Sequence, residues 1–168
     1  MPLNDDWSEF LRALISTETR FLLIGGLAIA VHAEPRFTED LDVFVEPTPE
    51  NAQRLLRALV EFGFGSVAPT VDQLAEPDRV WMLGLKPRRI DVLTGISGVS
   101  FADAARDRVV VAVGSQLIPV ISRRALLKNK RASGRPKDLL DVELLKKYAA
   151  NKPSPKRSVT KKNLRRRA

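Results

Sequence analysis

Short apolar runs, each ended by glycine, proline or charged residues, alternate along this chain with longer amphipathic segments. The short runs have the length of buried strands, and the longer segments repeat apolar residues at helical spacing. This alternation predicts an α/β (α+β) fold in which helices flank a mixed sheet. The predicted helices cover 7–15, 27–33, 49–62, 101–107, 122–131 and 136–148, and the predicted strands cover 20–24, 40–45, 80–85, 89–93, 109–113 and 116–121. Residues 66–78 are predicted to form a loop with a short helical turn.

Positive charge is concentrated at one end of the chain. The 168 residues carry a formal net charge of +8. Residues 151–168 contain eight basic residues and no acidic one, which leaves 20 of each in residues 1–150. We therefore expect a neutral domain over 1–150 and a basic, disordered tail over 151–168. The tail is either a solubilising segment or an electrostatic handle for RNA, whose phosphates attract lysine and arginine.

Cysteine is absent and His32 is the one histidine, which limits the possible metal chemistry. Disulfides, thiolate metal sites and multi-histidine centres are excluded. A divalent metal would need oxygen ligands, which favours Mg²⁺ or Mn²⁺ over zinc. No apolar run approaches the ~20 residues that cross a membrane, and the start lacks the apolar core of a signal peptide. We therefore expect a cytoplasmic protein that does not engage the membrane.

Two acidic residues interrupt the predicted strand 40–45, where aspartate is normally rare. Residues two apart on a strand face the same side, so Asp40 and Asp42 lie ~6.6 Å apart along one face. Leu41 and Val43 then face the core on the other side. Neighbouring carboxylates repel unless a cation lies between them, which suits a Mg²⁺ that also contacts phosphate oxygens. The alternative is a solvated sheet face that carries two acids.

Two further features extend this pattern. Asp91 lies in another predicted strand, and beside the strand of Asp40 it would complete a three-carboxylate cluster. Crowding would raise its pKa and suit it to act as a general base, whereas the alternative is an ordinary acid on a hairpin. Gly25 and Gly26 stand where a buried strand becomes a helix. They permit either close approach of an anion to the backbone or a tight turn.

The segment FLLIGGLAIAVHAEPRFTEDLDVFVE resembles the signature of the DNA polymerase β-like nucleotidyltransferase superfamily. That signature is an apolar strand, a Gly-Gly pair, a gap of roughly a dozen residues and Asp-x-Asp, with a third carboxylate on a later strand. The sequence pattern Arg-x-Thr-x-Asp-x-Asp over residues 36–42 looks most like that of small bacterial nucleotidyltransferases related to AbiEii-type toxins. The resemblance covers about residues 20–147, and residues 126–141 are similar to the C-terminal part of those relatives.

The resemblance implies a minimal nucleotidyltransferase fold and a reaction. Asp40, Asp42 and Asp91 would hold two Mg²⁺ ions, with Mn²⁺ as an alternative. The turn at Gly25 and Gly26 would bind the β- and γ-phosphates of a nucleoside triphosphate. An acceptor hydroxyl would attack the α-phosphorus, and pyrophosphate would leave.

Four residues are further candidates for nucleotide binding. Lys128, on a helix after the sheet, is the candidate for the triphosphate, because related toxins use a lysine there. Lys130 competes for that role, and the alternative for both is a basic helix face. Arg36 and Thr38 directly precede the aspartate pair, where they would contact phosphate or steady the strand.

The last two predicted helices carry charges for which a structural role is expected. Ser122 is placed to cap the first of them. Asp138 and Asp141 lie three residues apart on the second, where we expect ion pairs with Arg135 or Lys137.

Two classes of function remain on the sequence. The first is magnesium-dependent transfer of a nucleoside monophosphate to a hydroxyl acceptor. The basic tail and the toxin-like sequence pattern favour a tRNA end as the acceptor, and a protein or a small molecule is the alternative. The second class is a non-catalytic nucleotide- or RNA-binding protein, although binding alone does not need three converging acids. The short C-terminal part suggests an open acceptor site or a partner subunit. The toxin-like sequence pattern suggests an antitoxin as a partner.

Overall fold

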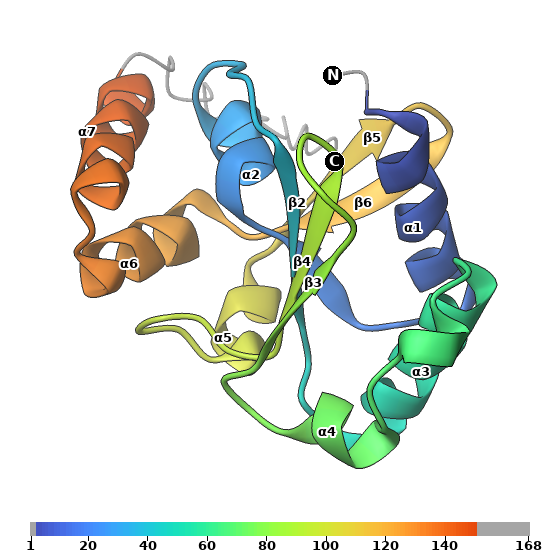
Figure 1. The fold of residues 1–168 in the computed structure, drawn as a ribbon. Coiled ribbons are helices and arrows are strands. Elements are labelled where there is room, and N and C mark those ends of the chain that lie inside the picture. Colours follow the sequence, from blue (N-terminus) through green and yellow to red (C-terminus); the bar gives the residue numbers. More distant parts are fainter. Residues whose placement is uncertain (1–2, 151–168) are drawn as a thin grey trace, which may run out of the picture.

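Six strands form one mixed sheet in the order β3-β4-β2-β1-β6-β5. A computed structural model describes residues 3–150 of the chain. Helices α1, α3 and α4 cover one side of the sheet, and α2, α6 and α7 lie on the other (Figure 1). The predicted α/β fold with a mixed sheet is therefore confirmed. Residues 151–168, predicted to form the basic tail, lie outside the described residues.

Every predicted element is present among residues 3–150, with ends that differ by a few residues. The strands are β1 (Phe21–Leu23), β2 (Asp40–Val45), β3 (Val80–Leu83), β4 (Arg89–Leu93), β5 (Val109–Val113) and β6 (Gln116–Val120). The helices are α1 (Asp5–Ser16), α2 (Gly25–His32), α3 (Pro49–Glu61), α4 (Val71–Ala75), α5 (Phe101–Arg106), α6 (Arg123–Ser133) and α7 (Pro136–Ala150), with a 3₁₀ turn, η1 (Gly65–Val67). No helix in this part of the chain has the length and apolar character that crossing a membrane requires.

The central strand β2 positions the residues of interest. It pairs antiparallel with β1 and parallel with β4. Leu41, Val43 and Val45 are fully buried on its core side, as the alternation predicts. Burying a side chain of this size stabilises the fold by about 1.5–3 kcal/mol. The opposite face of β2 therefore presents its aspartates in a fixed orientation.

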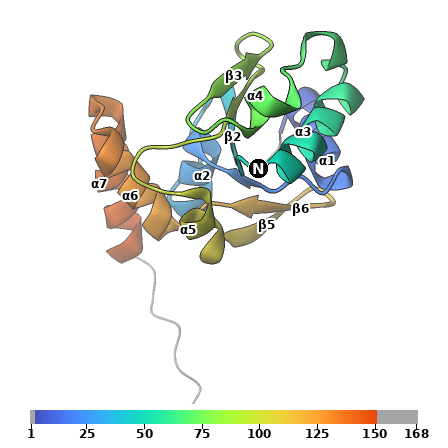
Figure 2. The ribbon, with the colours of Figure 1, turned by 90° about the horizontal axis from the view of Figure 1, so that it is seen from below.

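Helices α1 and α3 pack against each other on one side of the sheet, which both views show (Figures 1 and 2). Helix α3 begins with Thr48 as its N-cap and Pro49 in its first turn. The buried face of α3 is not the face that carries all of its leucines and Val60. Leu55 and Leu59 are buried, but Val60 is 56% exposed, because the small side chains Ala52 and Ala58 face the core in its place.

A buried ion-pair network joins α6 to α7. Ser122 caps α6 as predicted, and the left-handed residue Gly134 ends it. Lys130 of α6 then donates to Asp138 Oδ1 at 2.6 Å and lies 3.1 Å from Asp141 Oδ2. All three side chains are buried. A buried charge that loses its partner destabilises a fold by about 3–5 kcal/mol, so this network fixes the position of α7.

The network predicts a specific loss of stability in acid. Burial alone would raise the pKa of Asp138, but hydrogen bonds from Lys130 and two neighbours outweigh it and lower the pKa from 3.8 to about 2. A lowered pKa in the folded protein stabilises it above the unfolded value, and that stability is lost as pH falls. We expect Asp138 to contribute about 2 kcal/mol to the loss of unfolding free energy between about pH 4 and pH 2.

Chemical denaturation of the wild type and of Asp138→Asn across this range measures the effect. The variant should be less stable at pH 7 and should show a flatter dependence on pH below 4. Asp72→Asn, at an exposed position on α4, serves as the control for removing one carboxylate. The same slope for wild type and Asp138→Asn would contradict the assignment.

Candidate active site

A cavity of about 1240 Å³ opens beside the face of β2 and β4 that carries the aspartates. The start of α2, the segment before β2 and the connection between α6 and α7 complete its walls. Seven of the residues predicted from the sequence line it together: Gly25, Gly26, Arg36, Thr38, Asp40, Asp42 and Asp91. The cavity exceeds the ~300–1,000 Å³ of typical small-molecule sites, so it has room for more than one ligand.

The register of two parallel strands brings the aspartates together. Asp42 of β2 lies opposite Asp91 of β4, and Asp40 lies opposite Arg89. Neighbouring strands are about 4.8 Å apart, and residues in register point to the same face. The three carboxylates therefore share one wall of the cavity. On the other face, Ile90 is buried in the core.

The Gly-Gly pair makes room for the side chains of this wall. Gly25 has a φ of +63°, and a Cβ there would lie 1.9 Å from Asp42 Oδ2. A Cβ on Gly26 would lie 2.8 Å from Thr38 Oγ1, which itself donates to the Asp40 carbonyl at 3.2 Å. The pair is therefore required by the packing of Asp42 and Thr38. Its predicted contact with phosphate remains a prediction.

Burial and like charge act on the same carboxylate. The pKa of Asp42 is raised by burial first, and then by the charges of Asp91 and Asp40. Lys130 and Arg89 lower it in part. The crowding of carboxylates that the sequence predicts therefore acts on Asp42.

Arg89 occupies the space between two of the aspartates. Its Nε and Nη2 groups donate to Asp91 Oδ1 and Oδ2, both at 2.8 Å. The same Nε lies 3.2 Å from Asp40 Oδ1, which is buried and accepts no hydrogen bond from the described residues. The Arg89 guanidinium therefore offsets part of the negative charge of this wall. The hydrogen bond to Asp91 raises the pKa of Arg89, so its charge is permanent.

The donor set fits a hard divalent cation in its chemistry. Carboxylate oxygens are the ligands that Mg²⁺ and Mn²⁺ prefer, and Asp40 Oδ1 is an oxygen that lacks a donor. As the side chains stand, however, no three acidic or histidine residues among 3–150 are arranged to hold a metal ion. Both Asp91 oxygens accept from Arg89 instead. A cation bound by all three aspartates would therefore require Arg89 to move.

The basic candidates separate clearly. Lys130 lines the cavity, whereas Lys128 is exposed and is not among the lining residues. Arg36 also lines the cavity and forms an ion pair with Asp141. Asp138 pairs with Arg135, as predicted, and also with Lys130.

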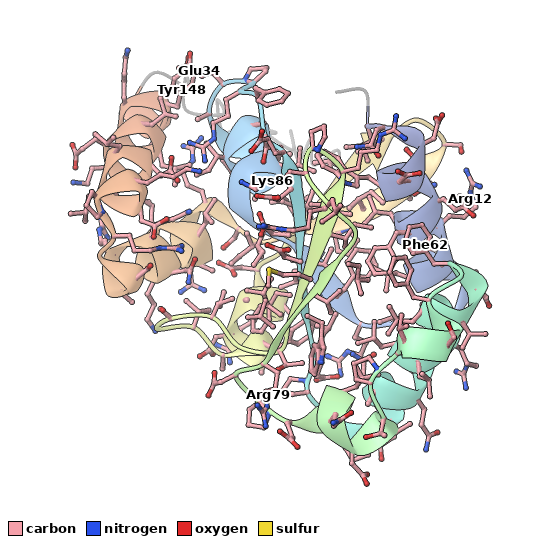
Figure 3. All side chains as sticks on the ribbon, in the orientation of Figure 1. Arg12, Glu34, Phe62, Arg79, Lys86 and Tyr148 are labelled. Carbon is pink, nitrogen blue, oxygen red and sulfur yellow. The ribbon has the colours of Figure 1, made fainter. Side chains whose placement is uncertain are left out.

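Two further contacts join distant segments, and the first of them connects residues that line the cavity. Lys86, from the turn between β3 and β4, donates to Glu39 at 3.0 Å and lies 3.9 Å from Asp40 Oδ2. Tyr148 of α7 donates to Glu34 at 2.5 Å, and these two side chains meet at the top of α7 in Figure 3. Local sequence patterns predict neither contact, because each joins segments far apart in the chain.

Gly25 offers a test of this packing. Gly25→Ala would combine left-handed strain with a clash against Asp42, whereas Gly114→Ala would add only the strain, since Gly114 has a φ of +60° and open space around it. Strain of this kind costs about 1–2 kcal/mol. We expect Gly25→Ala to lower the unfolding free energy by about 2 kcal/mol more than Gly114→Ala, which thermal or chemical denaturation measures. Equal losses would show that Asp42 does not pack on Gly25.

One solved structure of similar fold supports the architecture described above. The crystal structure of ANT(2")-Ia in complex with adenylyl-2"-tobramycin matches with a TM-score of 0.52 and 14% identity, over 86% of this chain and 91% of that chain. An antigenic nucleotidyltransferase-like protein from Paracoccidioides brasiliensis matches with a TM-score of 0.48 and 18% identity, over 86% and 78%. A search of curated protein sequences gives no significant match.

A family model establishes the relationship at the level of sequence. The model described as nucleotidyl transferase AbiEii toxin, type IV TA system, matches residues 9–113. This range is more than half of the chain and includes the Gly-Gly pair and all three aspartates of the cavity wall. The resemblance found in the sequence is thereby confirmed, and the non-catalytic alternative gives way to an enzyme. The chain belongs to the AbiEii family of nucleotidyl transferase toxins, and the carboxylate wall of its cavity marks the candidate active site of a nucleotidyltransferase.

Proposed function

We propose that the protein transfers a nucleoside monophosphate from a nucleoside triphosphate to a hydroxyl acceptor, with Asp40, Asp42 and Asp91 as ligands of divalent cations. The observation that carries this proposal is the register of Asp42 beside Asp91 on the cavity wall. Two like charges are held side by side there at a cost to stability, which is typical of functional sites. Mg²⁺ is the proposed cofactor, with Mn²⁺ as a substitute, and it would neutralise charge on the phosphates and the leaving group.

The residues of the chain supply position and a proton acceptor. The acceptor oxygen would bond to the α-phosphorus while the bond to the pyrophosphate oxygen breaks. The hydroxyl proton would pass to a carboxylate of the wall, for which Asp91 is the proposed base. Gly25 and Gly26 place backbone N–H groups at the start of α2 beside the cavity, where the triphosphate would bind. Lys130 replaces Lys128 as the proposed lysine of this site, because Lys130 lines the cavity.

RNA is the proposed acceptor, with a tRNA end as the proposed site of transfer. The eight basic residues in 151–168 provide an attraction for phosphates that a small-molecule acceptor would not need. The cavity of about 1240 Å³ exceeds the usual volume of small-molecule sites, which supports an acceptor bound beside the nucleotide. A small-molecule acceptor is the second candidate, because the structural neighbour ANT(2")-Ia was solved with an adenylylated aminoglycoside. The family also suggests an antitoxin as a partner protein.

Asp42→Asn tests the reaction directly. Purified protein is incubated with each of four labelled nucleoside triphosphates, Mg²⁺ and total tRNA. We expect label on RNA with the wild type and a loss of at least about 100-fold with Asp42→Asn, because a cation ligand is removed. Transfer by the variant at the wild-type rate would contradict the proposed site, and label on a small molecule alone would identify the second candidate.

The same variant should be more stable than the wild type at neutral pH. The pKa of Asp42 is raised by its burial and its acidic neighbours, so its stabilising contribution is complete in acid and is lost as pH rises through the folded pKa. An uncharged asparagine avoids this loss, and we expect a gain of about 1 kcal/mol at pH 7 that shrinks toward pH 4. Denaturation at the two pH values measures it. Lower stability of the variant at pH 7 would contradict the electrostatic description.

The role of the basic segment is tested by deleting residues 151–168. RNA affinity falls linearly with salt concentration on a log–log plot. If about four charges of this segment contact phosphates, its deletion should make the slope of that plot shallower by roughly 3, at ~0.7 per contact. The loss should be similar for unrelated RNA sequences, because contacts to phosphate do not read bases. RNA binding by the full-length and shortened proteins across a salt series measures both. Equal slopes would favour a small-molecule or protein acceptor.

A further inference from the structure

Arg89 holds the carboxylates that the proposed cation needs. It lies two residues before Asp91 on β4 and opposite Asp40 on β2, so strand geometry points all three side chains into the cavity. The Arg89–Asp91 contact is a two-pronged hydrogen bond, with both N···O distances at 2.8 Å. Planar pairs of this kind are among the strongest charge-assisted contacts in proteins. Asp91 is therefore tied to a permanent cation of the chain itself.

The guanidinium and a divalent cation cannot share this position. Arg89 Nε reaches 3.2 Å from Asp40 Oδ1 and 2.8 Å from Asp91 Oδ1, so the guanidinium fills the gap between the two aspartates. A cation held by these carboxylates would compete with the guanidinium for the same oxygens, and the two positive charges would repel each other. The Arg89 side chain is 25% exposed and borders the cavity, so it has space into which to turn.

On the basis of the proposed function, we propose that Arg89 is a positioning residue that competes with the divalent cation for Asp91 and then binds the triphosphate. Arg89 holds Asp40 and Asp91 together until the cation arrives. It then leaves the carboxylates and turns into the cavity, where its N–H groups match phosphate oxygens. Cation binding and nucleotide binding are thereby coupled through one side chain.

Arg88 provides a matched control. It is the adjacent residue, carries the same charge and belongs to the same turn region, but it is 62% exposed and pairs with Asp6 at 3.3 Å. It lines a different, smaller cavity near α1. Arg88→Gln therefore changes the net charge of the protein as Arg89→Gln does, without touching the carboxylate wall.

The first experiment measures Mn²⁺ binding by the electron paramagnetic resonance signal of the free ion. We expect Arg89→Gln to bind Mn²⁺ about tenfold more tightly than the wild type, because the competing charge is gone. Arg88→Gln should stay within about twofold of the wild type. Equal affinity of wild type and Arg89→Gln would overturn the competition. If neither protein binds Mn²⁺, the proposed cation site itself fails, and the inference falls with it.

The second experiment observes the wild-type side chain, so it does not depend on a variant that folds. The Nε–H resonance of Arg89 is followed by nitrogen-detected NMR during a Mg²⁺ titration. We expect it to shift and to exchange faster with water as Mg²⁺ binds. The Nε–H of Arg124, which donates to Asp107 at 2.8 Å away from the cavity, should not move. If other resonances report Mg²⁺ binding while the Arg89 resonance stays unchanged, the proposed release of Arg89 from the carboxylates is overturned.

The third experiment tests the phosphate contact with inorganic tripolyphosphate at saturating Mg²⁺, by calorimetry. Arg89→Gln should bind tripolyphosphate at least about tenfold more weakly than the wild type, and Arg88→Gln should bind it equally well. Arg89→Lys keeps the positive charge but loses the planar guanidinium with its paired N–H donors. Its affinity for tripolyphosphate should therefore lie between those of the wild type and Arg89→Gln. Tripolyphosphate affinity that is the same for Arg89→Gln and the wild type would overturn the second half of the proposal.

Discussion

The parallel pairing of β2 with β4 is the constraint on which the site depends. It places Asp42 directly beside Asp91 at the spacing of neighbouring strands, with Asp40 two residues away on the same face. A shift of one residue would turn the aspartates of one strand into the core. The apolar residues on the other face are fully buried, so this register cannot slip without exposing them. The core therefore fixes the carboxylates at close range despite their repulsion.

The surrounding elements compensate for that repulsion from several directions. Gly25 leaves room for Asp42 against the start of α2, and Lys130 reaches the cavity from α6. Arg89 offsets part of the charge of the wall from within the sheet. Lys130 is itself anchored by acids of α7, so the position of the C-terminal helices and the electrostatics of the wall are connected. Helices α6 and α7, which lie beyond the region of the family match, therefore contribute to the charge of the cavity.

Local patterns in the sequence predicted the elements and the acidic pair, because strand alternation depends only on neighbouring residues. The pairing of Asp42 with Asp91 is a contact between distant segments, and no local pattern states the register. Arg89 had a usable signal, since it shares a strand face with Asp91 two residues away. The choice between Lys128 and Lys130 had none. Their helical phase separates the two faces of α6, but only tertiary packing decides which face meets the cavity.

The charges that line the cavity bear on how a nucleotide would enter it. Among the described residues, six lysine and arginine side chains border the cavity, and five of them form ion pairs with acids of the chain. Residues 1–150 as a whole contain equal numbers of acidic and basic residues. Within the described part of the chain, the cavity thus offers a triphosphate few cations that are not already paired. A highly charged anion would gain little by entering unless it brought positive charge with it or freed a cation inside. Both routes lead to the carboxylate wall, where a divalent ion that arrives with the nucleotide would bind and where the guanidinium of Arg89 would be freed.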